Sequence, residues 1–120
     1  LDDQAIEGFT HAVDIGCGAG ELVERLAGAY PSSAVLGLDI SAALLTVARQ
    51  RCAALAHASF LQTDAAVWRA DPGSTPDLLI SRHGVMFFAD PVAAFTRLRK
   101  QSAPAARLLF SCFRARADNG

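Results

Sequence analysis

Long apolar runs are absent from this sequence of 120 residues. Arg, Asp, Gly or Pro interrupts each apolar stretch well before the ~20 residues that a membrane-spanning helix needs. The opening residues 1–4 are acidic at positions 2 and 3, whereas a signal peptide begins with basic residues and then turns apolar. An excess of charge of one sign is also lacking, since 11 Lys and Arg stand against 12 Asp and Glu. The near balance gives no electrostatic case for nucleic acid as a partner.

Cysteine is scarce, and its spacing predicts neither disulfides nor zinc. Cys17, Cys52 and Cys112 are odd in number and widely separated, with no C-x-x-C pair. Reduced thiols of this kind are typical of a cytoplasmic protein, and we expect that location and no metal site. The length allows one hydrophobic core but not two, so we expect residues 1–120 to form a single domain.

Short apolar runs alternate with helical patterns along the chain. Apolar runs of four to eight residues predict strands, and apolar residues recurring every three or four positions predict the helices between them. Asp90-Pro91 is typical of a helix start, with Asp as cap and Pro at the first helical position. The predicted strands are His11–Gly16, Ala34–Asp39, Ser59–Thr63, Asp77–Ser81 and Arg107–Phe113, and the predicted helices are Glu21–Tyr30, one capped by Ser41 and one starting at Pro91.

This alternation predicts a doubly wound α/β fold. Consecutive parallel strands need crossover connections, so the sheet is expected to be mainly parallel, with helices on both faces. In such open sheets, ligands bind beyond the carboxyl ends of the strands. The residues after each predicted strand are therefore the ones to examine for function.

A glycine-rich segment follows the first predicted strand. Gly16, Gly18 and Gly20 allow tight turns and a close backbone approach to a ligand. The spacing departs from the G-x-G-x-x-G pattern of dinucleotide-binding loops, because position 21 is Glu. The carboxylates of Asp14 and Glu21 also disfavour a phosphate at the helix N-terminus. A ligand with an ammonium and a sulfonium group, such as S-adenosylmethionine, suits this loop better.

Acidic residues also follow the second and third predicted strands. Asp39 can accept both hydrogen bonds of a ribose diol, although NAD carries the same diol and a helix cap is the alternative role. Asp64 can accept from the exocyclic amine of adenine, with the Ala65 amide facing the ring, and capping the next turn is its alternative role. We expect the acids after strands one, two and three to form a row along one edge of the sheet.

These motifs resemble those of class I S-adenosylmethionine-dependent methyltransferases. Val13–Gly20 is similar to the family's glycine-rich first motif, and Leu36–Ser41 resembles its acidic second-strand motif. Asp64 stands where the family contacts adenine. The segment Asp77–Pro91 is similar to the fourth-strand motif of the small-molecule methyltransferases. The resemblance covers about residues 10–113.

The resemblance implies a fold, a cofactor and a reaction. The implied strand order is 3-2-1-4-5, and the implied reaction is in-line transfer of the methyl group of S-adenosylmethionine to a small-molecule acceptor. By the resemblance, the residues that bind the methionine part of the cofactor are Asp14, Gly16, Cys17, Gly18 and Gly20, together with the backbones of Ser81 and Arg82. Asp39 binds the ribose, and Asp64 with Ala65 binds the adenine. Ile40 is also expected among the cofactor-binding residues.

His83 is the one candidate for a catalytic base, because it follows strand four near the expected position of the methyl group. A packed or surface histidine is the alternative interpretation.

The family normally continues into an antiparallel hairpin after strand five, which this chain lacks. We therefore expect a core truncated at the C-terminus, with the apolar strand Arg107–Phe113 at an edge of the sheet, where another strand can pair with it. A homodimer through that edge is one prediction. Two other functions stay open, namely a non-enzymatic or truncated module that binds S-adenosylmethionine and a nicotinamide-dependent oxidoreductase.

Overall fold

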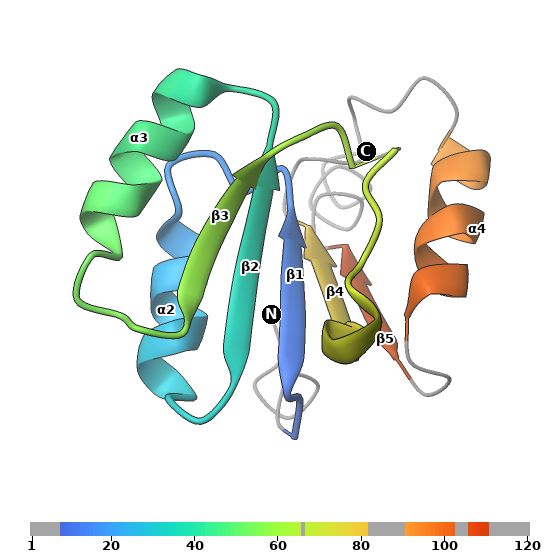
Figure 1. Cartoon of the computed structure of the whole chain (residues 1–120), viewed down its shortest axis with the longest axis horizontal. Helices are drawn as coiled ribbons and strands as arrows, with labels where there is room; N and C mark the ends of the chain where they lie inside the picture. Colours follow the sequence, from blue (N-terminus) through green and yellow to red (C-terminus); the bar gives the residue numbers. More distant parts are fainter. Residues whose placement is uncertain (1–7, 66, 82–90, 103–105, 111–120) are drawn as a thin grey trace, which may run out of the picture.

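The computed structural model describes residues 8–65, 67–81, 91–102 and 106–110, and all its strands belong to one parallel sheet. The order β3-β2-β1-β4-β5 confirms the predicted order 3-2-1-4-5 (Figure 1). The predicted α/β class is confirmed as well. In chain order the elements are β1 (His11–Ile15), α2 (Glu21–Ala29), β2 (Ala34–Asp39), α3 (Ala42–Arg51), β3 (Ala58–Gln62), the 3-10 turn η1 (Pro72–Ser74), β4 (Leu78–Ser81), α4 (Pro91–Gln101) and β5 (Arg107–Phe110).

The core lies on both faces of the sheet because strand residues alternate between them. On one face, Ala12 and Ile80 pack with the buried residues of α2 and α3. On the other face, Val13 and Leu79 pack with Leu98 of α4 and with Trp68. Both faces of the central strands are therefore apolar, as expected for a parallel sheet.

Helices cover the two faces unequally in the described part of the chain. The connection from β3 to β4 contains only the turn η1 instead of a full helix, and Trp68 from this connection covers part of the sheet. A groove of about 410 Å³ remains over β1–β3, and Leu61 beside it is 44% exposed. The predicted helices on both faces are confirmed, with α2 and α3 on one face and α4 on the other, and the connection from β3 to β4 adds only a short turn. The physical reason is the segment Asp71–Ser74, whose Pro and Gly interrupt helix formation.

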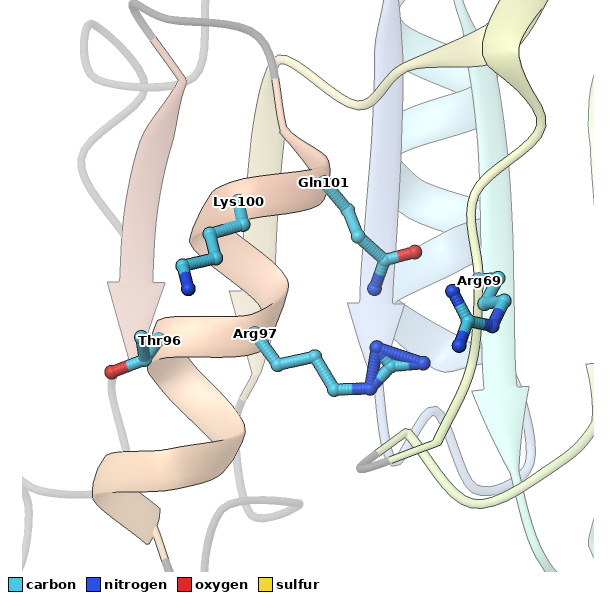
Figure 2. A pocket seen from close by; sticks show the side chains of 5 residues that line it. All are labelled: Arg69, Thr96, Arg97, Lys100 and Gln101. Carbon is cyan, nitrogen blue, oxygen red and sulfur yellow. The ribbon is translucent and has the colours of Figure 1, made fainter.

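Hydrogen bonds fasten this connection to α4. Nη2 of Arg97 donates to the Val67 carbonyl at 2.8 Å. The amide of Gln101 donates to the Trp68 carbonyl at 2.7 Å and accepts from the Ala70 amide at 2.6 Å. Figure 2 shows both side chains reaching from α4 toward the connection, at a groove of about 510 Å³ lined by Arg69, Thr96, Arg97, Lys100 and Gln101. Two of these polar residues on α4 therefore support the fold directly.

Side-chain hydrogen bonds join the neighbouring strands β1 and β4 at both of their ends. At their amino ends, the Asp77 carboxylate accepts from the Thr10 amide at 2.8 Å, the Thr10 hydroxyl at 3.0 Å and the His11 amide at 2.9 Å. Partial burial alone would raise the pKa of Asp77, but these hydrogen bonds outweigh it and lower the pKa. At the carboxyl ends, the Ser81 hydroxyl donates to the Ile15 carbonyl at 2.9 Å. The edge of the sheet where ligands are expected is held in register by this bond.

In the part of the chain that the structure describes, none of the helices is both long and apolar enough to span a membrane.

Candidate functional site

The loop between β1 and α2 depends on its glycines. Gly16, Gly18 and Gly20 have φ angles of 72°, 58° and 88°, a region that side chains with a Cβ atom rarely adopt. At Gly20 space is restricted as well, since an added Cβ would lie 2.8 Å from the Ala48 Cβ and 3.4 Å from the Phe60 ring. An added Cβ at Gly18 would meet nothing within 4 Å. The third glycine thus allows α3 to approach the loop, and the second leaves its outer surface open.

The backbone of the loop is docked onto the end of β2. The amides of Gly16 and Cys17 both donate to the Leu38 carbonyl, at 2.8 and 2.9 Å, and the Gly20 amide donates to the Cys17 carbonyl at 3.1 Å. These bonds fix the direction in which the loop leaves the sheet. The loop is therefore a defined surface at the carboxyl edge, where the sequence predicted it.

Asp39 connects the glycine-rich loop to the next helix. One carboxylate oxygen accepts from the Gly18 amide at 2.9 Å, and the other accepts from the Ser41 amide at 2.8 Å. Ser41 in turn caps α3, since its hydroxyl accepts from the Leu44 amide at 3.2 Å. Ribose binding and helix capping were the two roles predicted for Asp39, and the geometry adds a third role, which is to hold the loop. The side chain stays partly exposed at the edge.

Asp14 lies beneath the loop instead of on the open edge. It is the penultimate residue of β1, is 3% exposed, and pairs in register with Gly37 and Ile80. The prediction that three acids form a row along the edge is therefore wrong for Asp14, and of the three only Asp39 and Asp64 are accessible there.

Cys17 is a buried thiol in the middle of the loop. Burial, together with the nearby carboxylates of Asp14 and Asp39, raises the pKa of Cys17 to about 12. Cys17 therefore stays protonated at neutral pH and is unsuited to act as a nucleophile. Its Sγ lies 3.8 Å from the Gly18 carbonyl, which it meets as a weak donor.

The edge beyond β2 and β3 combines an apolar surface with an acid. Ile40 follows β2 directly and is 67% exposed, which is unusual for a large apolar side chain. Asp64 is exposed two residues after β3, while Ala65 is buried against the sheet. The Thr63 amide donates to the Asp39 carbonyl at 3.0 Å, so the two strand ends stay paired here. The three predicted residues are thereby brought to the same edge as Asp39.

The fourth-strand candidates are only partly described. Ser81 is 1% exposed at the end of β4, and its hydroxyl is used within the fold, which leaves its backbone for the predicted role. Arg82 and the candidate base His83 lie outside the described residues.

Sequence reasoning missed two features of the site. An added Cβ at Gly37 in β2 would lie 2.7 Å from Phe60 and 2.8 Å from the Sγ of Cys17, so this glycine makes room for the loop. An isolated glycine within a strand was the available signal. The other feature is Arg51 at the end of α3, which donates from Nε to the Ala19 carbonyl at 3.1 Å. No local pattern marks such a long-range contact.

Metal chemistry has no support among the described ranges, where His, Cys, Asp and Glu nowhere gather in a group of three able to hold an ion.

Comparison with known proteins adds curated relatives. The chain is similar to trans-aconitate 2-methyltransferase of Paracidovorax citrulli, with 40% identity over 95 residues that cover 79% of this chain and 35% of that protein. The protein of the same name in Klebsiella pneumoniae is 36% identical over 93 residues, covering 78% of this chain and 35% of the relative. The chain spans about a third of the length of the curated relatives it matches.

Solved structures show the same fold. One is the StiE O-methyltransferase segment of residues 961–1257, with a TM-score of 0.80, 20% identity and coverage of 89% of this chain and 39% of that chain. Another is the N-methyltransferase NodS from Bradyrhizobium japonicum in complex with S-adenosylhomocysteine, with a TM-score of 0.73, 24% identity and coverage of 89% and 57%.

The family itself is given by a match of residues 12–105 to the family described as "Methyltransferase domain". This range includes the glycine-rich loop, Asp39, Asp64 and Ser81. It leaves no support for the nicotinamide-dependent alternative. The chain therefore belongs to the class I S-adenosylmethionine-dependent methyltransferase family.

Proposed function

We propose that this protein binds S-adenosylmethionine at the carboxyl edge of its sheet and transfers the methyl group to a small-molecule acceptor. The observation that carries the proposal is the junction of loop and sheet, where the Gly16–Gly20 loop is docked on β2 and its Gly18 amide is held by Asp39. This junction fits the methionine, ribose and adenine parts of the cofactor in shape and charge.

The loop fits the methionine part of the cofactor. Gly18 presents its Cα toward open space, so a ligand can approach the backbone there without meeting a side chain. Asp14 below the loop supplies negative charge for the ammonium and sulfonium groups. We propose that Gly16, Cys17 and Gly20 contribute through their backbone, and Ser81 and Arg82 likewise from the end of β4.

Asp39 fits the ribose. An ionised carboxylate offers about four acceptor positions, and the amides of Gly18 and Ser41 occupy one on each oxygen. The partly exposed carboxylate therefore keeps acceptor capacity for the two hydroxyls of the diol. The two amide bonds also fix the orientation of the carboxylate before the ligand arrives, which lowers the entropic cost of binding.

Ile40, Asp64 and Ala65 fit the adenine. The exposed side chain of Ile40 offers an apolar surface for one face of the base. The exposed Asp64 carboxylate can accept from the exocyclic amine, while the backbone of Ala65 faces the ring edge. Together with the loop and Asp39, these residues extend along the edge from β1 to β3.

The chemistry needs little from the protein beyond placement. The cofactor supplies a methyl group already activated by its sulfonium: the carbon–sulfur bond breaks as the bond to the acceptor forms, and S-adenosylhomocysteine leaves. The protein orients the reactants and excludes water, which contributes up to about 7–11 kcal/mol in favourable cases. The acceptor's proton passes to a base or to water, and we propose His83 for that role from its position after β4.

The chemical class of the acceptor is proposed from the relatives. The curated relatives are named for trans-aconitate, so a small organic acid is the first acceptor to test. We further propose that residues 1–120 form one cofactor-binding domain. Cys17 and Cys52, both buried free thiols, support a reducing, cytoplasmic location.

A transfer assay with methyl-labelled S-adenosylmethionine tests the proposal. Trans-aconitate and a panel of small carboxylic acids serve as acceptors, and the labelled product is separated from the cofactor. Label in at least one acceptor is the expected result. Tight binding of S-adenosylhomocysteine without transfer to any acceptor would support a non-enzymatic binding module instead. His83→Ala should leave the affinity for S-adenosylhomocysteine unchanged and slow the transfer more than tenfold, on the order expected for a general base.

A further inference from the structure

The C-terminal end of α3 is in contact with the glycine-rich loop. Nε of Arg51 donates to the Ala19 carbonyl at 3.1 Å. The neighbouring Cys52 places its Sγ 3.9 Å from the Gly20 carbonyl, and Ala48 lies one helical turn earlier against the Cα of Gly20. These contacts join the loop to a helix that is distant in sequence.

Arg51 also reaches a second segment. Its Nη1 lies 3.5 Å from Oε1 of Glu24 in α2, an ion pair whose side chains are 36% and 44% exposed. The pair contributes little by itself at this exposure. It does orient the guanidinium, whose planar fork can serve a carboxylate and a carbonyl at the same time. Arg51 thus links α3, the loop and α2.

The bond to Ala19 has a specific consequence for the loop. The peptide between Ala19 and Gly20 is held on both sides, because its carbonyl accepts from Arg51 and its amide donates to the Cys17 carbonyl at 3.1 Å. A peptide that precedes a glycine can rotate at low cost, since glycine tolerates both signs of φ. Rotation would break both of these bonds and change the path of the loop backbone that receives the ligand. The guanidinium opposes that rotation.

We propose that Arg51 is a positioning residue of the cofactor loop, which acts by holding the Ala19–Gly20 peptide in the orientation that receives the methionine part of the cofactor. This inference rests on the proposed function, because it assumes that the loop receives that part. Arg51 itself contacts the loop from the side of α2 and α3, and we do not expect it to contact the ligand.

Two ligands and two variants test this role. S-adenosylhomocysteine contains the methionine part, whereas adenosine occupies only the ribose and adenine positions. Arg51→Ala should weaken binding of S-adenosylhomocysteine roughly three- to tenfold, the scale of one partly exposed hydrogen bond to a charged group, and leave adenosine affinity within about twofold. Arg51→Lys, which keeps the charge but lacks the fork, should fall between the parent and Arg51→Ala.

Arg49 offers the matched control. It lies on the same helix with the same charge, and its Nη2 donates to the Phe60 carbonyl in β3 at 3.3 Å instead of to a carbonyl of the loop. Arg49→Ala should leave the affinity for both ligands within about twofold of the parent.

Equal losses for the two ligands in Arg51→Ala, or no loss for either, would overturn the positioning role while the proposed function stands. A parent protein that binds adenosine but gains nothing from the methionine part would overturn both.

Discussion

Replacing Gly20 by alanine should destabilise the protein and disturb the loop, because this position is restricted in two independent ways. The φ angle of 88° costs a residue with a Cβ about 1–2 kcal/mol. The added Cβ would also lie 2.8 Å from the Ala48 Cβ and 3.1 Å from the Ala48 Cα. The Cα belongs to the backbone of α3 and cannot move aside as a flexible side chain could. Overpacking of this kind costs about 1–3 kcal/mol.

The magnitude of the net effect follows from these contributions. Alanine lowers the conformational entropy of the unfolded chain relative to glycine, which offsets about 0.4–1 kcal/mol of this destabilisation. The free energy of unfolding of Gly20→Ala should therefore be about 2–4 kcal/mol below that of the parent. That is a large part of the ~5–15 kcal/mol typical of a domain. At about 4 °C per kcal/mol, the melting temperature should fall by roughly 8–16 °C.

Gly28 provides the control within the same region. It lies near the end of α2, is exposed, and an added Cβ there would meet nothing within 4 Å. Gly28→Ala should therefore stabilise the protein slightly, by up to about 0.5–1 kcal/mol, through helix propensity. Urea unfolding of both variants, followed by circular dichroism, measures the difference. A Gly20→Ala variant as stable as Gly28→Ala would refute the reasoning about close approach of α3 to the loop.

Four further predictions follow from individual contacts. Asp39→Asn should weaken binding of S-adenosylhomocysteine by about 1.5–3 kcal/mol in calorimetry, because it removes the charge and one of the two acceptor oxygens of the carboxylate. Unchanged binding would contradict the roles of Asp39 in holding the loop and in binding the ribose. Hydrogen bonds lower the folded-state pKa of Asp77, so its contribution to stability is present above the ordinary pKa of 3.8 and is lost as the pH falls further. Asp77→Asn should flatten acid unfolding in that range, and an unchanged acid profile would argue against this role. Cys17 should resist iodoacetamide at pH 8 in the folded protein and react after denaturation, as mass spectrometry can show, whereas rapid alkylation of the folded protein would contradict its raised pKa. Among the described residues β5 is an edge strand, so we expect residues 1–120 to form a dimer through it in light scattering, and a strict monomer would exclude that pairing.

The parallel pairing of the sheet was predictable from the sequence pattern, whereas its order, 3-2-1-4-5, was predicted from the resemblance to the family. Alternating strand and helix patterns require parallel pairing, and the second strand, Ala34–Asp39, was predicted with the bounds that the structure shows. The Ser41 cap was also confirmed, since it rests on a local hydrogen bond to the Leu44 amide. Strand bounds and helix caps depend on residues that are close in the sequence, so they could be predicted from it.

The site was predictable only as far as its motifs reach. Positive φ angles at Gly16, Gly18 and Gly20 agree with the glycine spacing. The depth of Asp14 was missed because it was grouped with the acids that follow the strands, although it lies inside the predicted strand His11–Gly16 and inside β1. The contact of Arg51 with the loop, 32 residues apart in sequence, depends on how α3 packs. Such long-range contacts leave no local pattern.

We expect the edge formed by the glycine-rich loop, Asp39 and Asp64 to bind S-adenosylmethionine and its product S-adenosylhomocysteine in preference to a nicotinamide cofactor. Titration calorimetry with S-adenosylhomocysteine and with NADH tests it most directly, because the ribose and adenine are common to both ligands and only the loop distinguishes them. We predict micromolar or tighter binding of S-adenosylhomocysteine, about −8 kcal/mol or more, and no saturable binding of NADH. Micromolar binding of NADH with no response to S-adenosylhomocysteine would contradict the account.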